Sequence, residues 1–378
     1  MICTRGIWDS TVPGIKFYED GSSNYAKMFD ELCKVYPRGI KGKEYWQNLI
    51  EKIKKKGKSK KYDCIIGVSG GTDSSYLLYV AKIIYGLRPL AVNLDNGWSS
   101  KIAVQNIKNV TKALDIDLET YVINYEEVIA VLRAYIKSSL PWIDGPTDLA
   151  INSALYKIAK REGIKYILIG SDFRSEGKQP IEWTHSDAKQ LSYIVNKYEK
   201  KKLKSFPYQT IYNTIYLSII KKIRIIYPYY YIDYEKKTAM DYLSKNFNWV
   251  YYGGHHHENI FTRFTIGYWL PKKFGIDKRI ITLSAQVLSG EITRVQAFDI
   301  LINHLYSLDE MEKDKKYVLK KLNISEEEFA EIWKSENKYY WDYPSYVPIV
   351  KRYSRISRFL AKKILFFTPT MFIEKENR

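Results

Sequence analysis

The segment from residue 62 to residue 85 constrains the fold of this chain more than any other. It begins with a continuous apolar run of strand length (YDCIIGV), passes through the turn SGGTDSS, and continues as an apolar helical stretch. A Gly-rich turn between a strand and a helix lets successive backbone N–H groups converge on one point, where the helix N-terminus adds partial positive charge. The segment therefore predicts a phosphate-binding loop in an α/β unit.

Strands and helices continue to alternate after this unit. The pattern predicts strands at 88–94, 118–123 and 164–169 and helices at 102–114, 126–138 and 148–161. Buried strands that alternate with amphipathic helices are typical of a parallel sheet. We therefore expect an α/β fold with a Rossmann-like core and helical C-terminal additions. The expected parts are an N-terminal segment at 1–60, the core with the phosphate loop at 61–180, a helical region that completes the site at 181–300, and a helical region with a basic tail at 301–378.

The loop residues have separate predicted roles. The hydroxyl groups of Ser69 and Ser74 can donate to phosphate oxygens, and Asp73 can hold Mg²⁺ on the phosphates. The lysine of the kinase-type GxxxxGK[ST] loop is missing, and so is the dinucleotide fingerprint GxGxxG. The predicted site for the phosphates of a nucleotide consists of Ser69, Gly70, Gly71, Thr72, Asp73, Ser74, Ser75, Asp95 and Gly170.

Composition narrows the class of protein. Hydrophobic residues make up 46% and charged residues 27% of the 378 residues, as in soluble globular proteins. The net charge of +18 favours a polyanionic partner, such as nucleic acid, an acidic nucleotide sugar or an anionic membrane surface. Three scattered cysteines predict no disulfide framework. The chain shows neither a secretory signal nor an apolar run of about 20 residues, so we expect a cytoplasmic protein.

The order SGGxDS at the end of a first strand resembles the signature of the PP-loop ATP pyrophosphatases. Further segments resemble one branch of them, the bacterial N-acetyl-sugar amidotransferases of the O-antigen, pseudaminic-acid and legionaminic-acid type. These segments are DNGW at 95–98, PTD at 146–148, YGGHHHE at 252–258, LPKKF at 270–274 and DKR at 277–279. The resemblance implies an ATP-dependent enzyme of lipopolysaccharide biosynthesis that adenylylates the oxygen of an acetamido group. Ammonia then replaces that oxygen, giving an acetamidino group, AMP and pyrophosphate.

The resemblance also implies a set of site residues. The predicted catalytic residues are Asp73, Lys272, Lys273, Lys278 and Arg279. The four cations would neutralise the triphosphate or grip an acidic sugar, and a solvated basic face is the alternative interpretation. The predicted substrate residues are Asn96, Trp98, Thr147, Asp148, Glu176, Gly253, Gly254, His256, His257, Glu258 and Arg263. A helix-capping role stays open for Asp95 and Asp148, and a surface position for Glu176.

The cysteine pattern departs from that family. CxxC pairs are expected near the N-terminus, but the first reads Cys3-Thr4-Arg5-Gly6 and the second begins at Ser23. We therefore expect ATP and Mg²⁺ and no zinc. Three consecutive histidines at 255–257 cannot all face one ion, which favours substrate contact over a metal site. The basic C-terminus carries apolar residues at helical spacing, 356, 360, 364 and 367, which predict packing onto the body or peripheral membrane contact.

No glutamine-hydrolysing half is visible, and Cys64 lies inside a buried strand. The resemblance therefore implies a separate glutaminase and a cyclase-like companion that supply ammonia to an acetamido sugar or nucleotide sugar. A PP-loop enzyme of tRNA modification is the alternative that the positive charge favours. No reactive cysteine pair or RNA-binding module supports it, so nucleic acid is not expected. An inactive binding subunit fits the lost cysteines but not the intact SGGTDSS.

Overall fold

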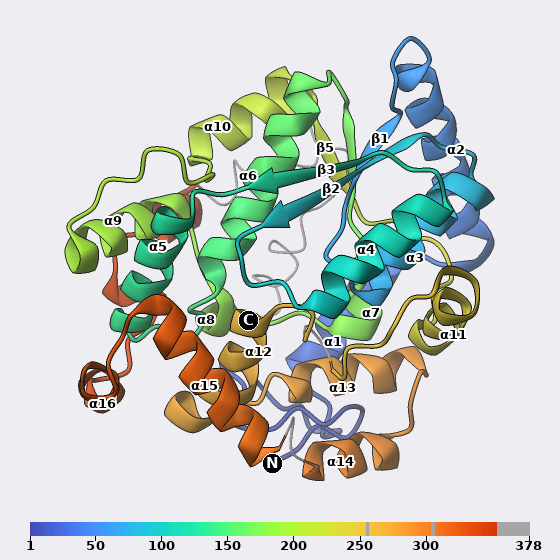
Figure 1. The fold of residues 1–378 in the computed structure, drawn as a ribbon. Helices are drawn as coiled ribbons and strands as arrows, with labels where there is room; N and C mark the ends of the chain where they lie inside the picture. The colour runs from blue at the N-terminus through green and yellow to red at the C-terminus, as the bar shows by residue number, and fades with distance from the viewer. Residues whose placement is uncertain (255–256, 304–306, 354–378) are drawn as a thin grey trace.

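The computed structural model of the protein describes residues 1–254, 257–303 and 307–353. Its centre is a parallel five-stranded sheet in the order β3-β2-β1-β4-β5 (Figure 1). The strands are β1 Cys64–Gly67, β2 Pro89–Asp95, β3 Leu118–Val122, β4 Tyr166–Leu168 and β5 Arg224–Ile226. The predicted α/β class with a parallel sheet is confirmed.

The strand order places a topological switch point between β1 and β4. From β1 the chain moves outward through β2 to β3, whereas β4 and β5 lie on the other side. Cys64 in β1 is opposite Pro89 in β2, and Ile65 is opposite Ile167 in β4. Open α/β sheets bind ligands at the carboxyl ends of the strands beside such a point. The phosphate loop that follows β1 therefore lies where a ligand is expected.

Four helices of the core lie close to their predicted positions. They are α3 Thr72–Tyr79, which continues as a π-helical turn over Val80–Ile84, α4 Lys101–Ala113, α5 Tyr125–Lys137 and α6 Gly145–Arg161. Side chains cap two of them: Ser100 accepts from the N–H of Ala103, and Asn124 accepts from the N–H of Glu127. Such caps satisfy N–H groups that have no partner within the helix.

One strand was not predicted. Residues 224–226 lie in a region that we expected to be helical, yet they form β5, with Arg224 opposite Tyr166 of β4. A strand of three residues is too short to show an alternating pattern, and only pairing with β4 defines it. The sheet therefore takes a strand from outside the predicted core at 61–180.

Helices surround the sheet and fill the rest of the molecule. Before it come α1 Asn24–Val35 and α2 Gly39–Gly57. After β4 come α7 Phe173–Glu176, α8 Ile181–Thr184, α9 Ala188–Glu199, α10 Ile211–Ile215 with a π-helical turn Tyr216–Ile220, and, after β5, the 3-10 turn Pro228–Tyr230 and α11 Lys236–Phe247. The last group is α12 Ile260–Phe264 with the π-helix Thr265–Phe274, α13 Arg279–Ser289, α14 Arg294–Ile302, α15 Leu308–Leu322, α16 Glu326–Lys334, the 3-10 turn Tyr340–Asp342 and α17 Val347–Arg352.

The segment that starts α12 is tied to the loop after β2. The N–H of Ile260 donates to the Trp98 carbonyl at 2.9 Å, and the N–H of Ser100 donates to the Glu258 carbonyl at 2.8 Å. Buried Trp269 joins a core cluster with Val131 of α5. The helices from α12 to α15, in the lower half of Figure 1, are therefore packed onto the sheet domain and are continuous with it.

Two expectations concern parts of the chain that the structure does not describe. His256 and the C-terminal stripe at 356, 360, 364 and 367 both lie outside the described residues. Within the described ranges, none of the helices has the length and apolarity needed to cross a membrane.

Candidate active site

A cavity of about 420 Å³ opens at the carboxyl edge of the sheet, beside the switch point. Gly67 of β1 and Leu94 of β2 line it, and residues from α6, α7 and α11 and from the 252–262 segment close its sides. Ten of the predicted site residues meet here: Ser69, Gly71, Asp73, Ser74, Asn96, Thr147, Asp148, Gly170, Glu176 and Glu258. One cavity therefore holds both the phosphate loop and much of the predicted substrate site.

Two glycines make the tight curvature of the loop possible. Gly70 has φ +82°, and a Cβ there would lie 2.3 Å from the Ala103 carbonyl oxygen. A Cβ on Gly170, which follows β4, would lie 2.8 Å from the Asp73 carbonyl oxygen. Trp249 Nε1, which does not line the cavity, donates to the Gly70 carbonyl at 3.1 Å. The loop is therefore held in its phosphate-binding shape by close backbone packing.

We expect Gly170→Ala to lower the rate of AMP formation by about a hundredfold, because the added methyl must displace the N-terminus of α3 and the phosphate loop. The rate is measured by following AMP release from ATP. Gly67→Ala is the matched control, since the atoms nearest to its methyl would be side-chain atoms of Leu155 and Ile169, at 3.3 Å or more, and not backbone atoms of the loop. Equal rates in the two variants would contradict the proposed role of close packing at Gly170.

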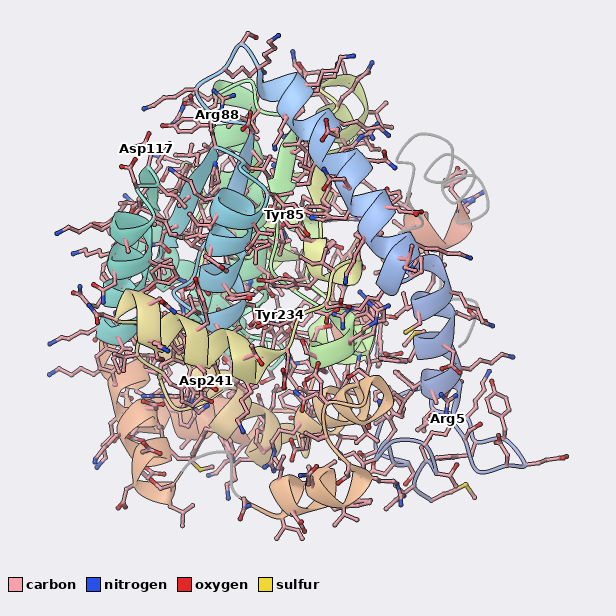
Figure 2. All side chains as sticks on the ribbon, turned by 90° about the vertical axis from the view of Figure 1, so that its right-hand side faces the viewer. Arg5, Tyr85, Arg88, Asp117, Tyr234 and Asp241 are labelled. Atoms are coloured by element: carbon pink, nitrogen blue, oxygen red, sulfur yellow. The ribbon has the colours of Figure 1, made fainter. Side chains whose placement is uncertain are left out.

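Asp73 is the centre of a polar cluster that the sequence did not predict. Tyr234 donates its hydroxyl to Oδ1, and Lys236 Nζ lies 3.5 Å from Oδ2. The Tyr229 hydroxyl donates to the Asp73 carbonyl at 3.0 Å, and its ring stacks on that of Tyr234 with centroids 4.0 Å apart. Figure 2 shows Tyr234 in the middle of the molecule, between α11 and the sheet domain. The tyrosine-rich stretch before α11 thus fixes the loop aspartate.

Lys236 is the cation nearest to the loop carboxylate. Burial lowers its pKa, but the charges of Asp73, Glu176 and Glu258 outweigh this effect and hold the pKa above its ordinary value. The side chain is therefore an ammonium at neutral pH. A fixed positive charge beside a phosphate loop can stabilise negative charge on a leaving pyrophosphate. The sequence signal available was a basic pair, Lys236 and Lys237, at the start of a helix.

The 252–258 segment contacts the phosphate loop directly. The Ser69 hydroxyl donates to Glu258 Oε1 at 3.3 Å, and the Thr72 N–H donates to the Tyr252 hydroxyl at 3.4 Å. Glu258 and Tyr252 both line the cavity, whereas Gly253 and Gly254 do not. The segment that was predicted to bind the sugar therefore also contacts the phosphate loop.

Two aspartates and an indole form a second polar group in the cavity lining. Trp142 Nε1 donates to Asp148 Oδ2 at 2.8 Å, and Lys278 Nζ lies 3.8 Å from the centroid of the Trp142 ring. Asp144 is 3% exposed; the Thr262 hydroxyl donates to its Oδ2, while Oδ1 has no hydrogen-bond partner among the described residues. Trp142 and Asp144 were not predicted, although both stand in the run WIDGPTD before α6.

The charges of two titrating groups, Asp144 and Lys278, influence each other here. Burial raises the pKa of Asp144 to about 7, and the charge of Asp148 adds to the shift. Burial lowers the pKa of Lys278 to about 8, although Asp148, Asp144 and Glu176 act in the opposite direction. A carboxyl and an amine with pKa values near neutrality can exchange protons with a bound substrate.

Most of the predicted basic cluster is not part of the cavity. Lys273 Nζ donates to the carbonyls of residues 332, 333 and 335, at the end of α16. Arg279 pairs with Asp277 and donates to the carbonyls of residues 300, 301 and 303, at the end of α14. The triphosphate role is therefore wrong for both side chains, which neutralise helix C-termini instead. Lys272 is exposed and does not line the cavity, and only Lys278 contacts the lining residue Trp142.

Lys273→Ala is accordingly expected to lower the free energy of unfolding by about 1–2 kcal/mol, since three carbonyls lose a charged donor. Thermal and urea unfolding measure this change. Lys272→Ala is the matched control and should leave stability unchanged. Neither variant should change the KM for ATP by more than about twofold, because surface substitutions away from the site have small effects. A large rise in KM with unchanged stability would restore the triphosphate role.

Several other predicted residues have structural partners. Asp95 Oδ1 accepts from the N–H of Gly97 at 2.8 Å and forms a turn, so its nucleotide role is not supported. Trp98 is fully buried against Phe261, and Arg263 forms two hydrogen bonds of 2.6 Å with Asp314. None of the three lines the cavity, and direct substrate contact by Trp98 and Arg263 is corrected to packing and pairing.

Of the remaining predicted residues, Gly70, Thr72, Ser75 and His257 do not line the cavity, whereas Asn96 and Thr147 do. Burial and the charge of Arg263 lower the pKa of His257 to about 4, so this imidazole is neutral. Gly70 turns the loop, while buried Thr72 and Ser75 lie in the first turn of α3. In the cavity, Asn96 Nδ2 donates to the Thr147 hydroxyl at 3.3 Å.

The donor set fits ATP with Mg²⁺. Gly71 lines the cavity at a position where a Cβ would lie 3.1 Å from the hydroxyl oxygens of Ser69 and Tyr252, and Asp73 offers a carboxylate at the loop. Among the described residues no group of three or more His, Cys, Asp or Glu side chains could hold a metal ion. Phosphate oxygens would therefore complete the coordination of a cation held by Asp73. The absence of zinc at the N-terminus stays a prediction.

Part of the chain matches a known family. Residues 258–357 match the model described as LPS biosynthesis protein WbpG-like, C-terminal domain. An uncharacterized protein of Methanocaldococcus jannaschii is 30% identical over 146 residues, or 37% of this chain. The chain spans about half, 49%, of that relative's length.

Three solved structures show a distant likeness. NMN synthetase from Francisella tularensis has a TM-score of 0.31 and 16% identity, covering 77% of this chain and 97% of its own. The NH₃-dependent NAD synthetase from Campylobacter jejuni has a TM-score of 0.32 and 15% identity, and the match covers 75% of this chain and 95% of its own. The U34-tRNA thiolase NcsA from Methanococcus maripaludis has a TM-score of 0.32 and 13% identity, and the match covers 86% of this chain and 89% of its own. Likenesses with TM-scores this low say nothing about a shared reaction.

The family match and the loop geometry both involve the phosphate loop. SGGTDSS directly follows β1 and opens α3 at the switch point of a parallel sheet. The WbpG-like match begins at Glu258, the residue that accepts from Ser69 of this loop. Residues 258–357 are therefore similar to the WbpG-like C-terminal domain, and SGGTDSS has the sequence order and the strand-to-helix position of a PP-loop signature.

Proposed function

We propose that this protein is an ATP-dependent amidotransferase that converts the acetamido group of a sugar into an acetamidino group during surface-glycan biosynthesis. The observation that carries the proposal is a single cavity that is lined both by the phosphate loop and by Trp142, Asp144 and Asp148. A nucleotide and a second polar substrate would meet inside it. The WbpG-like match, described for LPS biosynthesis, supports a glycan as the second substrate.

In the first step the acetamido oxygen attacks the α-phosphorus of ATP. A bond forms between the acetamido oxygen and the α-phosphorus. At the same time the bond from the α-phosphorus to the bridging oxygen breaks, and pyrophosphate leaves with that oxygen. The N–H groups at the start of α3 and the Lys236 ammonium would stabilise the charge that develops on it. Bound Mg²⁺ would add charge neutralisation, with Asp73 as the protein group that holds it.

In the second step ammonia attacks the activated carbon. A C–N bond forms, the C–O bond breaks, and AMP leaves with the original acetamido oxygen. Ammonium must first lose a proton, because its nitrogen lone pair is otherwise occupied. Asp144, which lines the cavity, is the group proposed to take this proton, and its Oδ1 atom has no hydrogen-bond partner among the described residues.

We also propose that ammonia comes from a separate glutaminase with a cyclase-like companion. The three cysteines do not supply an activated nucleophile: burial raises the pKa of the Cys64 and Cys33 thiols, and Cys3 is buried. High concentrations of ammonium should therefore replace the partners in an assay.

The test is an assay with ATP, Mg²⁺, ammonium and a panel of free and nucleotide-linked acetamido sugars. The expected result is AMP and pyrophosphate with one sugar only, together with an O-to-NH exchange in the mass of that sugar. ADP as the nucleotide product would contradict the proposed chemistry. AMP that forms only after tRNA is added would instead support an enzyme of tRNA modification.

A further inference from the structure

The continuous helix made by α10 and its π-helical turn, residues 211–220, has an exposed apolar stripe. Tyr212, Ile215, Tyr216 and Ile220 are 76%, 49%, 40% and 64% exposed. Spacings of three and four residues put them on one side of the helix. Leu217, only 7% exposed, anchors the helix to the body of the protein. Four large apolar side chains together on an exposed stripe indicate a contact with an apolar medium.

Lysines surround this stripe. Lys221 Nζ lies 5.5 Å and Lys160 Nζ 5.7 Å from the centroid of the Tyr216 ring. Lys165 Nζ donates to the Lys221 carbonyl at 2.9 Å, so it lies beside the end of the same helix. Burial lowers the pKa of Lys165, and so do the positive charges of nearby lysines, which include Lys60 and Lys222. Lysine side chains therefore lie beside the Tyr216 ring of the stripe and beside the end of its helix.

Acidic side chains do not offset this charge. Residues 200–232 contain seven lysine or arginine residues and no aspartate or glutamate. Nearby acids are already in ion pairs: Glu119 and Glu162 with Arg161, and Asp117 with Lys61. The surface therefore presents a positive field next to exposed apolar groups.

The position of the surface leaves the cavity open. Residues 221–223 lead into the amino end of β5, whereas the cavity lies at the carboxyl ends of the strands. In Figure 1, α10 and the turn between α2 and β1 both lie in the upper half of the molecule. In Figure 2 this turn lies at the end of the molecule where Arg88 and Asp117 are labelled. Arg5 marks the opposite end. A flat partner could cover the α10 surface without blocking substrate entry.

We propose that helix 211–220 and the surrounding lysines 60, 160, 165, 221 and 222 dock the protein on an anionic phospholipid bilayer. Tyrosine and isoleucine side chains would enter the boundary between headgroups and acyl chains, and the lysines would lie at the level of the phosphates. A bilayer satisfies both features at once. A nucleic acid would match the lysines but leave Ile215 and Ile220 in water. This inference does not depend on the proposed reaction.

The test is co-sedimentation of the full chain with vesicles of phosphatidylcholine alone or mixed with phosphatidylglycerol. We expect binding only to the mixed vesicles, with an affinity that falls as salt increases. Ile215→Asn combined with Ile220→Asn, and separately Lys221→Glu combined with Lys222→Glu, should each weaken binding by about tenfold or more. Residues 354–378 are present in every variant, so their basic side chains contribute equally.

The matched control is Val295→Asn combined with Ile302→Asn on α14, where the two side chains are 70% and 79% exposed. This variant should bind like the wild type. Unchanged binding of the α10 variants would overturn the proposal, and so would equal binding to uncharged vesicles. A dimer in sedimentation velocity that the α10 apolar substitutions dissociate, without vesicle binding, would assign the stripe to a second copy of the chain instead.

Discussion

Replacing Lys236 by methionine is expected to lower kcat for AMP formation by about a hundredfold or more, the usual cost of losing one fixed donor to developing charge. Its ammonium is held beside Asp73, in the cavity that contains the phosphate loop. Methionine keeps most of the volume of the stem, so packing at the start of α11 should be preserved. The loss should appear in kcat, because the leaving pyrophosphate carries more negative charge than bound ATP does at the bond that breaks.

Lys237→Met provides the matched control. Lys237 is the next residue on the same helix and is exposed, so its substitution should leave kcat and KM unchanged. The measurement is steady-state AMP formation at saturating ATP and ammonium, with thermal unfolding to confirm that both variants are folded. Equal kcat values for the two variants would show that Lys236 only neutralises Asp73.

The part of the site that could be predicted from the sequence depends on contiguous residues. Strand, SGGTDSS and helix follow one another from 62 to 85, so the loop has one place to lie once the strand enters a parallel sheet. Gly170 was likewise predicted because it directly follows a buried strand. The residues next to each position in the sequence were therefore sufficient to predict the loop and Gly170.

The part that was missed depends on long-range pairing. Tyr234 and Lys236 approach Asp73 because β5 pairs with β4 and directs the following residues across the carboxyl edge of the sheet. A three-residue strand carries no periodic signal, so neither the strand nor the contacts after it were visible in the sequence.

The basic cluster was misinterpreted for a related reason. Lys273 and Arg279 were counted as available charges, but they lie against the carboxyl ends of α16 and α14. These ends are distant in sequence, and only the packing of the last helices brings them close. Lys278 lies beside the cavity, where its ammonium contacts the Trp142 ring and the charge of Asp148 raises its pKa.

Asp144→Asn is expected to separate the two proposed steps. The amide keeps the shape of the carboxyl group but cannot take a proton from ammonium, so AMP formation in steady state should fall by about a hundredfold or more. Exchange of labelled pyrophosphate into ATP, in the presence of the acceptor sugar and without ammonium, should persist because it requires only the first step. Parallel loss of both activities would contradict the assignment of Asp144 to the ammonia step.

The pH profile gives a second measurement on the same variant. In the wild type, the rate at saturating ammonium should rise with pH as the Asp144 carboxyl, with a pKa of about 7, loses its proton, and then level off. The variant has no such group and depends on free ammonia from solution. Its rate should therefore continue to increase above the pH at which the wild type becomes constant.

Stability should change in the opposite direction from activity. The folded-state pKa of Asp144 is raised above 3.8 to about 7, so folding favours the protonated carboxyl. The wild type is therefore stabilised by this group at low pH and loses that contribution as pH rises through about 7, where a buried charge must form. Asn carries no charge at any pH, so Asp144→Asn should be more stable than the wild type by a few kcal/mol at pH 8 and nearly equal to it near pH 4. Urea unfolding at the two pH values measures this difference, and Asp148→Asn, whose carboxylate accepts from Trp142, is the comparison. A variant that is inactive and also less stable at pH 8 would show that the carboxylate of Asp144 holds the fold together and is not kept there for proton transfer.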